Sequence, residues 1–286
     1  MPNKPRKAKV WLHPRAIERE YVAYCESFAD ATYAAVRDFV VPTFDRIPGR
    51  ADAVEDIPEA AGWFETLRQS FLAAAARVRQ TSIGARVAEF AAAVNRFNSN
   101  QFHAVIRSAY GVDVFKAEPW LVDVLKNWES QNISLIRSIP AESLSRLHGK
   151  IVQAVRTGQT VRDLRKIIQD EYGISKRRAD LIANDQIGKL NGQLTQERQV
   201  GIGVKKYRWR GVLDNRERDE HVAREGVEFS WDKPPDGGHP AEAIRCRCRA
   251  EAILPLFEDL EGLQFPDLTP RRAQGLFPQL PGAARI

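Results

Sequence analysis

Soft metal ligands gather in one short segment near the C-terminus. Two of the three cysteines, Cys246 and Cys248, and two of the five histidines, His221 and His239, lie within residues 221–248. Thiolate and imidazole groups are the usual ligands of zinc, and a structural zinc site normally takes four of them. These four residues are therefore the candidate ligands of a zinc ion. The alternative is that the histidines hydrogen-bond within a compact sheet and the cysteines pack as small hydrophobic residues.

The same segment carries carboxylates that could serve a hydrolytic reaction. Asp214, Asp219 and Asp232 accompany His221 and His239, and such groups can act as a general base or hold a catalytic metal. A metal-dependent nuclease or toxin-like enzyme is therefore an alternative. The sequence contains no H-E-x-x-H motif, no G-x-x-x-x-G-K-[ST] loop, no G-x-S-x-G elbow and no glycine-rich dinucleotide loop. We expect a structural protein without catalytic residues, in which these polar side chains support turns and strands.

Positive charge gathers just before this segment. The chain has a formal net charge of +6 and a pI near 9.3, and residues 176–210 hold nine Lys or Arg against three acids. Basic side chains that alternate with Tyr207 and Trp209 suit phosphate contact and base stacking. The alternative is a solvated edge strand whose charges discourage pairing with another strand. The candidate DNA-binding residues are Lys205, Lys206, Arg208 and Arg210.

A series of short motifs runs through the same region. The motifs are Arg178-Ala179-Asp180-Leu181-Ile182-Ala183 with Asn191 beyond it; Gly203-Val204 before Trp209; Asp214, Arg216, Arg218 and His221 in the pattern D-x-R-x-R-x-x-H; the turn from Gly226 to Phe229 and Trp231; and His239-Pro240 followed by Cys246-Arg247-Cys248. Together they resemble the phage Mu F-like minor head proteins, the phage head morphogenesis family. The resemblance covers residues from roughly Val114 to Leu254 and is densest after Lys176.

The resemblance implies a phage minor head (capsid) protein that acts in head morphogenesis, with phage portal and capsid proteins as partners. It implies synthesis in the host cytoplasm and a final location in the virion, inside the capsid, where packaged double-stranded DNA is a candidate partner. Related domains also occur fused to toxin modules, which keeps the enzyme alternative open. Arg218 stands where many members have a cysteine, and the gap from His239 to Cys246 is longer than usual. The four-ligand pattern of such relatives is therefore only partly reproduced.

Length and composition fit a soluble globular protein with two structural units. The chain has 286 residues, of which 43% are hydrophobic and 28% are charged. No apolar run approaches the roughly 18 residues that cross a bilayer, and the charged N-terminus lacks the apolar region of a signal peptide. We therefore expect no membrane partner. Three cysteines, with Cys25 isolated, provide no disulfide framework and suit a reducing cytoplasm.

Apolar periodicity predicts helices through most of the chain. Three stripes mark the first of them: Ile17, Tyr21, Tyr24, Phe28, Ala31 and Ala35; Trp63, Leu67, Phe71, Ala74 and Val78; and Val87, Phe90, Ala91, Val94 and Phe97. Residues 42–58 contain prolines and a glycine and are expected to form a loop. Gly158 is expected to separate helices over 141–157 and 161–172, the first opening at Pro140. A third helix is expected from Lys176 to about Val200, with Ser175 as its cap.

After Gly203 the apolar period changes to two. Alternation around residues 205–210, 227–231 and 246–251 predicts three short strands that form an antiparallel sheet on the long helix. The C-R-C alternation would place both thiols on one face of the third strand. The expected fold class is α+β: a predominantly helical N-terminal region, a C-terminal long helix packed on a small antiparallel sheet, and an extended proline-rich tail.

The expected domains follow these changes of pattern. They are a helical region over 1–113, a Mu F-like domain over 114–254 and a proline-rich tail over 255–286. The tail holds five prolines together with scattered leucines and phenylalanines, so it favours extended backbone and cannot build a core of its own. It is either an arm that docks on a neighbouring subunit or a wrap over its own domain.

Overall fold

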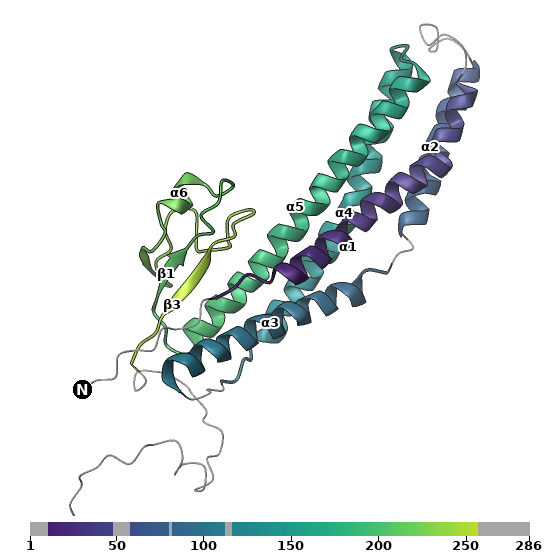
Figure 1. The fold of residues 1–286 in the computed structure, drawn as a ribbon. Coiled ribbons are helices and arrows are strands. Elements are labelled where there is room, and N and C mark those ends of the chain that lie inside the picture. The colour runs from purple at the N-terminus through teal and green to yellow at the C-terminus, as the bar shows by residue number, and fades with distance from the viewer. Residues whose placement is uncertain (1–10, 48–57, 80–81, 112–115, 257–286) are drawn as a thin grey trace, which may run out of the picture.

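Long helices form an elongated bundle, and a small sheet lies beside one end of it (Figure 1). The computed structural model describes residues 11–47, 58–79, 82–111 and 116–256. The helices are α1 (Arg15–Phe39), α2 (Pro58–Arg79), α3 (Gly84–Tyr110), α4 (Leu121–Arg156), α5 (Val161–Gly201) and the short α6 (Asp219–Val222), with a 3-10 helix over Val41–Arg46. The strands are β1 (Lys206–Arg210), β2 (Glu228–Ser230) and β3 (Arg249–Ile253), antiparallel in the order β2-β1-β3. The α+β prediction is confirmed.

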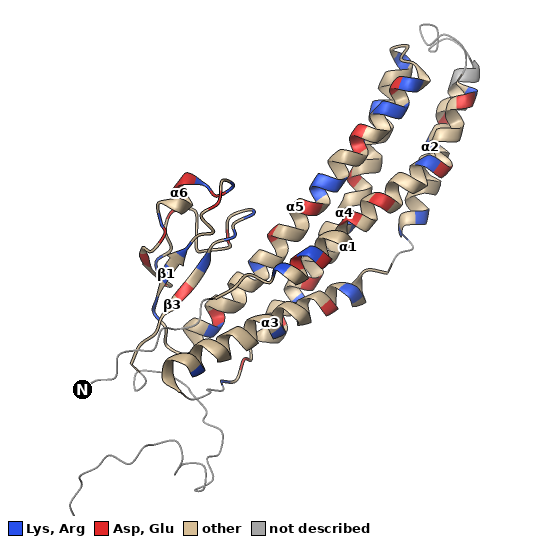
Figure 2. Ribbon diagram, viewed as in Figure 1, with Lys and Arg blue, Asp and Glu red and all other residues tan. Residues whose placement is uncertain are grey.

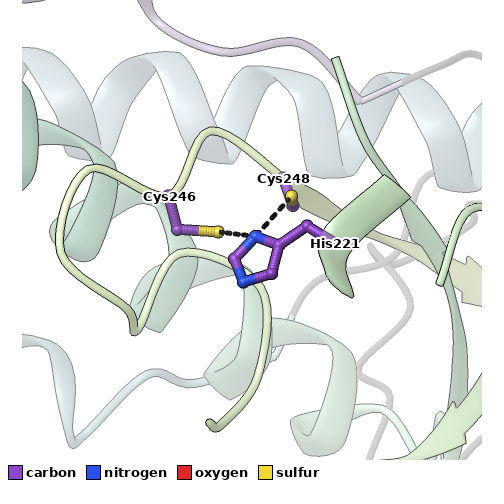
Figure 3. Close-up of side chains that lie close together, drawn as sticks. All are labelled: His221, Cys246 and Cys248. Atoms are coloured by element: carbon purple, nitrogen blue, oxygen red, sulfur yellow. Dashed lines mark hydrogen bonds between the residues drawn. The ribbon is translucent and has the colours of Figure 1, made fainter. Parts of the chain in front are cut away.

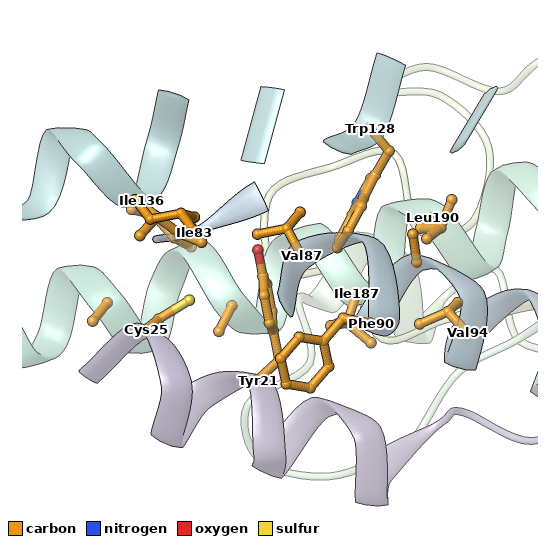
Figure 4. Packing of buried hydrophobic residues seen from close by; sticks show 14 of the residues in the cluster. Tyr21, Cys25, Ile83, Val87, Phe90, Val94, Trp128, Ile136, Ile187 and Leu190 are labelled. Atoms are coloured by element: carbon orange, nitrogen blue, oxygen red, sulfur yellow. The ribbon is translucent and has the colours of Figure 1, made fainter. Parts of the chain in front are cut away.

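The apolar stripes build the core of the bundle. Most of their residues are buried, among them Tyr21, Leu67 and Val87, although Ala31 is exposed. Figure 4 shows Tyr21 of α1 packed between side chains of α3, α4 and α5. Its hydroxyl donates to Asn132 Oδ1 at 2.8 Å, and Asn132 Nδ2 donates to Gln186 Oε1 at 3.1 Å. A polar chain therefore joins α1, α4 and α5 within the apolar core, where an unpaired polar group would be costly.

Two predicted helix breaks do not occur. Pro140 was expected to open a helix, but it lies inside α4, and Ile136 and Ile139 beside it are fully buried. Ser175 was expected to cap a helix, yet α5 runs without interruption from Val161. The N-terminus of α5 is capped instead by Thr160 and Asp163, which form a capping box. Burial of the flanking apolar residues in the bundle therefore overrides the local tendency of proline and serine to end a helix.

Other local expectations also change. The loop expected over 42–58 begins inside the 3-10 helix, where Phe44 is buried, and residues 48–57 lie outside the described part of the chain. The boundary predicted between residues 113 and 114 and most of the predicted tail, residues 257–286, lie outside it as well. None of the described helices is long and apolar enough to cross a membrane.

The sheet docks on the last turns of α5. Gln199 Nε2 donates to the carbonyl of Ala250 in β3 at 3.1 Å, and Trp231 Nε1 donates to Gln199 Oε1 at 3.2 Å. Trp11 and α3 close the other side of a core that contains Tyr207 and Trp209 of β1. The predicted packing of the sheet on the long helix is therefore confirmed.

Gly192 lets the loop before β3 lie directly against α5. A Cβ at this position would lie 2.6 Å from the Cβ of Ala241 and 3.2 Å from the carbonyl oxygen of Pro240. Ala241 itself adopts a φ of 75°, a left-handed conformation that is costly for a residue other than glycine. The docking of this loop thus depends on the absence of a side chain at Gly192.

The same glycine-to-alanine change at two helical positions distinguishes the packing role of Gly192 from the effect of helix propensity. Gly149 lies on an exposed face of α4 with no atom near the position of a Cβ, so Gly149→Ala should raise the free energy of unfolding by up to about 1 kcal/mol. Gly192→Ala should lower it by about 1–3 kcal/mol, because the loop must move away from α5. Denaturant unfolding of both variants measures the difference. Equal stabilisation by the two changes would show that the close approach at Gly192 does not matter.

Candidate metal centre and basic face

His221 is positioned by the short helix α6, which lies between β1 and β2 in the sequence. The imidazole packs edge-on against the indole of Trp209, with ring centroids 5.2 Å apart, and only 3% of the residue is exposed. Trp209 is buried because β1 turns its alternate side chains toward the core. The side chain of Trp209, on the inward face of β1, therefore positions the imidazole of His221.

Cys246 and Cys248 reach this ring from the loop before β3 (Figure 3). The Nδ1 atom of His221 lies 3.6 Å from Sγ of Cys246 and 3.4 Å from Sγ of Cys248. The ligand atoms of the three buried residues all lie within 4.8 Å of one another. The sequence predicted that strand alternation would place both thiols on one face. β3 begins only at Arg249, so the two thiols instead converge through the shape of the loop before it.

Glu217 extends this cluster, and the sequence analysis did not single it out. The thiol of Cys248 donates to Glu217 Oε1 at 3.0 Å, while the backbone N–H of Leu213 donates to Oε2 at 2.5 Å. The carboxylate lies over Gly211, where a Cβ would collide with it. Gly211 was the sequence feature that could have pointed to Glu217, but the sequence alone does not show which side chain lies against this glycine.

A hollow of about 180 Å³ opens beside the cluster. It is lined by the three cluster residues, Val212, Glu217 and four arginines: Arg216, Arg218, Arg245 and Arg247. Arg247 contacts both carboxylate oxygens of Asp214 at 2.6 Å, and this guanidinium lowers the pKa of Asp214 to about 2. Arg218 donates to the carbonyl of Ile244 at 2.7 Å. Arg245 pairs with Asp180, so the arginines of the walls that have no ion pair among the described residues are Arg216 and Arg218.

The two thiols have opposite acidities. The hydrogen bond with Cys248 lowers the pKa of Cys246 to about 6, despite its burial. The same hydrogen bond, burial and the nearby Glu217 raise the pKa of Cys248. Cys246 also accepts the backbone N–H of Ala241 at 3.3 Å, which favours a negative sulfur. Cys246 is therefore the thiol that ionises first.

His239 lies away from the cluster. Its Nδ1 atom is 2.9 Å from the hydroxyl of Tyr207, its ring lies 4.9 Å from that of Trp231, and only 6% of the residue is exposed. Its backbone N–H donates to Glu242 Oε2 at 2.8 Å. Of the four candidate ligands, the structure therefore brings His221, Cys246 and Cys248 together and places His239 with the aromatic rings of the sheet.

Two of the three carboxylates considered for catalysis have separate partners. Asp214 pairs with Arg247, and Asp232 accepts a hydrogen bond from the hydroxyl of Ser230. Asp219 lies in the first turn of α6. Within the described ranges, the group of residues that could hold a metal contains none of these aspartates.

The candidate DNA-binding face is largely neutralised by acids of the same sheet. Arg208 pairs with Glu228 at 2.9 Å, and Arg210 pairs with Glu251 at 2.7 Å and with Glu225 at 3.0 Å. Lys206 of β1 and Lys205 just before the strand are exposed, and no acid pairs with them among the ion pairs of the described residues. Figure 2 shows the mixing of charges on the sheet and along the helices. Tyr207 and Trp209 are fully buried, so they are not available to stack on bases.

Titration of the thiols tests their unequal acidity. In reduced, chelator-treated protein, the ultraviolet absorbance of thiolate should show one ionisation with a midpoint near pH 6, because the folded protein favours the Cys246 thiolate. Cys246→Ser should remove this step. Cys25 is an internal control, since burial raises the pKa of its thiol to about 12. A first ionisation only in the ordinary thiol range, well above neutrality, would contradict the arrangement.

Part of the chain is similar to a known protein family. Residues 145–251 match the family model described as phage Mu protein F like protein. A relative from Haemophilus influenzae, described as an uncharacterized protein, is 33% identical over 153 residues, which is 52% of this chain and 34% of that protein. The chain thus aligns with about a third of that relative's length. No solved structure matches. The matched segment contains the end of α4, all of α5 and nearly all of the sheet, and this segment is similar to the phage Mu protein F like family.

Proposed function

We propose that the protein acts in phage head morphogenesis as a minor head protein, associated with the portal inside the capsid. The observation that carries the proposal is the match of residues 145–251 to the phage Mu protein F like family. The motifs that suggested this family lie on α5, on the sheet and in the loops between them. A structural role in the virion, with capsid and portal proteins as partners, agrees with that family.

The positions of the motif residues favour an architectural role over an enzymatic one. Trp209, Trp231, Cys246 and Cys248 are buried in the core of the sheet, and Asp214 holds Arg247. These side chains hold the unit together, and none of the aspartates that a nuclease would use lies in the group of described residues that could hold a metal. A nuclease or toxin-like activity therefore has less support than a structural one.

The proposed contact with the head involves the proline-rich tail, which lies almost wholly outside the described residues. The folded part reaches at least Pro255, whose carbonyl accepts a hydrogen bond from the hydroxyl of Tyr110 at 2.8 Å. A chain that ends after Leu256 keeps this contact and all of β3. Leucine and phenylalanine side chains on an extended arm could then fill pockets on a neighbouring subunit, and prolines would reduce the entropy lost on docking.

Co-expression with portal and capsid proteins tests the assembly role. The full chain should co-purify with procapsids, whereas the chain that ends after Leu256 should remain soluble, melt cooperatively and stay outside them. Loss of the cooperative melt would show that the tail belongs to the fold. Absence of the full chain from procapsids would contradict the minor head role, and normal incorporation of the shortened chain would place the contact elsewhere.

We also propose contact with packaged DNA. Of the four candidate residues, only Lys205 and Lys206 support it, because Arg208 and Arg210 form ion pairs with nearby acids. Lys205→Glu with Lys206→Glu should weaken duplex binding and reduce the salt slope of log K by about 1.8, the value for two lost phosphate contacts. The matched control is Arg162→Glu with Lys166→Glu on the exposed first turns of α5, which changes the net charge equally. Neither pair should alter the thermal melt by much, because exposed charges contribute little to stability. Equal losses in both variants would mean that only net charge matters.

A further inference from the structure

We infer that His221, Cys246, Cys248 and Glu217 form a binding site for a zinc-class divalent cation, with Glu217 as the fourth ligand. The inference does not depend on the proposed role in head assembly. It rests on the distances between the ligand atoms, on the orientation of the Glu217 carboxylate and on the charges around the hollow.

The distances among the first three ligands fit a tetrahedral ion. Zinc binds imidazole nitrogen at about 2.0 Å and thiolate sulfur at about 2.3 Å, so nitrogen and sulfur ligands in a tetrahedral site lie about 3.5 Å apart. The Nδ1 atom of His221 lies 3.6 Å from one sulfur and 3.4 Å from the other. All three groups are buried and converge on one small volume. No large movement is needed for them to bind an ion.

Glu217 is the residue best placed to complete the site. Its Oε1 atom lies 3.0 Å from Sγ of Cys248, and the N–H of Leu213 holds Oε2, so the carboxylate borders the cluster. Glu217 is outside the group of three whose ligand atoms all lie within 4.8 Å of one another, so its side chain must turn toward His221 and Cys246 to bind the ion. Carboxylate oxygen binds zinc at about 2.0–2.2 Å. Arg218 is a cation and cannot serve as a ligand. His239 is held by Tyr207 and Trp231, away from the cluster.

The surroundings suit a negatively charged ligand set. Two thiolates and one carboxylate would exceed the charge of a divalent ion by about one negative unit. Arg216 and Arg218, which line the hollow and have no ion pair among the described residues, offset this excess. The N–H of Ala241 donates to Cys246 Sγ at 3.3 Å, and such outer contacts orient metal ligands and tune their affinity. A bound ion would therefore join α6, the 213–217 turn and the loop before β3.

Metal titration of the full chain, prepared reduced, metal-free and without a histidine tag, tests the site. Zinc should bind at one equivalent per chain, and cobalt(II) should show thiolate charge-transfer absorption together with the visible bands of a tetrahedral complex. Cys248→Ser should weaken this absorption. Glu217→Gln should weaken zinc binding at least about tenfold, because it removes the anionic ligand but keeps the shape. Cys25→Ala and Glu225→Gln are the matched controls, since Cys25 lies in the helical core and Glu225 pairs with Arg210.

Three outcomes would overturn the inference. The first is the absence of stoichiometric zinc or cobalt binding to the folded wild-type chain. The second is an unchanged affinity in Glu217→Gln, which removes Glu217 as a ligand. The third is loss of binding in His239→Gln together with normal binding in Glu217→Gln, which would assign the fourth position to His239. If the cysteine variants do not fold, the wild-type and Glu217→Gln titrations, with thermal melts as a check on folding, still decide the question.

Discussion

The whole structure depends on one helix that must bury two different surfaces. One face of α5 lies in the bundle against α1, α3 and α4, and the end of the same helix receives the sheet. The first surface needs large apolar side chains such as Ile187 and Leu190. The second needs a close approach of backbone, which Gly192 permits, and polar contacts, which Gln199 provides. An interruption of α5 would separate the sheet from the bundle.

This dependence explains the shape of the sheet unit. Three short strands have too little apolar surface to be stable alone. Tyr207 and Trp209 become buried because Trp11, α3 and the end of α5 cover the inner face of the sheet. The aromatic side chains of the basic band are therefore core residues, and acids of β2 and β3 balance Arg208 and Arg210 on the outer face. Among the four candidate DNA-binding residues, Arg208 and Arg210 therefore form ion pairs within the sheet unit, whereas Lys205 and Lys206 are the exposed cations.

The cluster around His221 lies where the fold has the least regular structure. The loop before β3 contains Ala241 and Arg245 with positive φ values of 75° and 57°, conformations that need support from their surroundings. The sulfur atoms of this loop reach the helix α6 and the carboxylate of Glu217. Contacts among these groups connect segments that no strand pairing joins, which gives the cluster a natural role in fixing the edge of the sheet.

The sequence by itself determined the α+β class, the apolar stripes of the helices, the change of period after Gly203 and the similarity of residues 145–251 to the phage Mu protein F like family. These features are local or lie in one segment, so periodicity and motif spacing are enough to find them. Its crowding of soft ligands also predicted His221, His239, Cys246 and Cys248 as candidate metal ligands, of which the structure brings the first, third and fourth together. The continuity of α4 through Pro140 and of α5 through Ser175 was not predictable in this way, because burial among distant residues outweighs local propensity.

Only the tertiary structure separated His239 from the other three candidate ligands and added Glu217 to them. Both outcomes depend on how the loop before β3 lies against α5, a contact between Gly192 and Ala241 that no pattern in the sequence records. The same holds for the basic residues 205–210, whose charges are visible in the sequence. Their partners Glu228 and Glu251 became known only from strand register, and Glu225 only from the fold of the turn before β2. Spacing along a chain shows which groups are available, whereas the close approach of separate segments decides which of them meet.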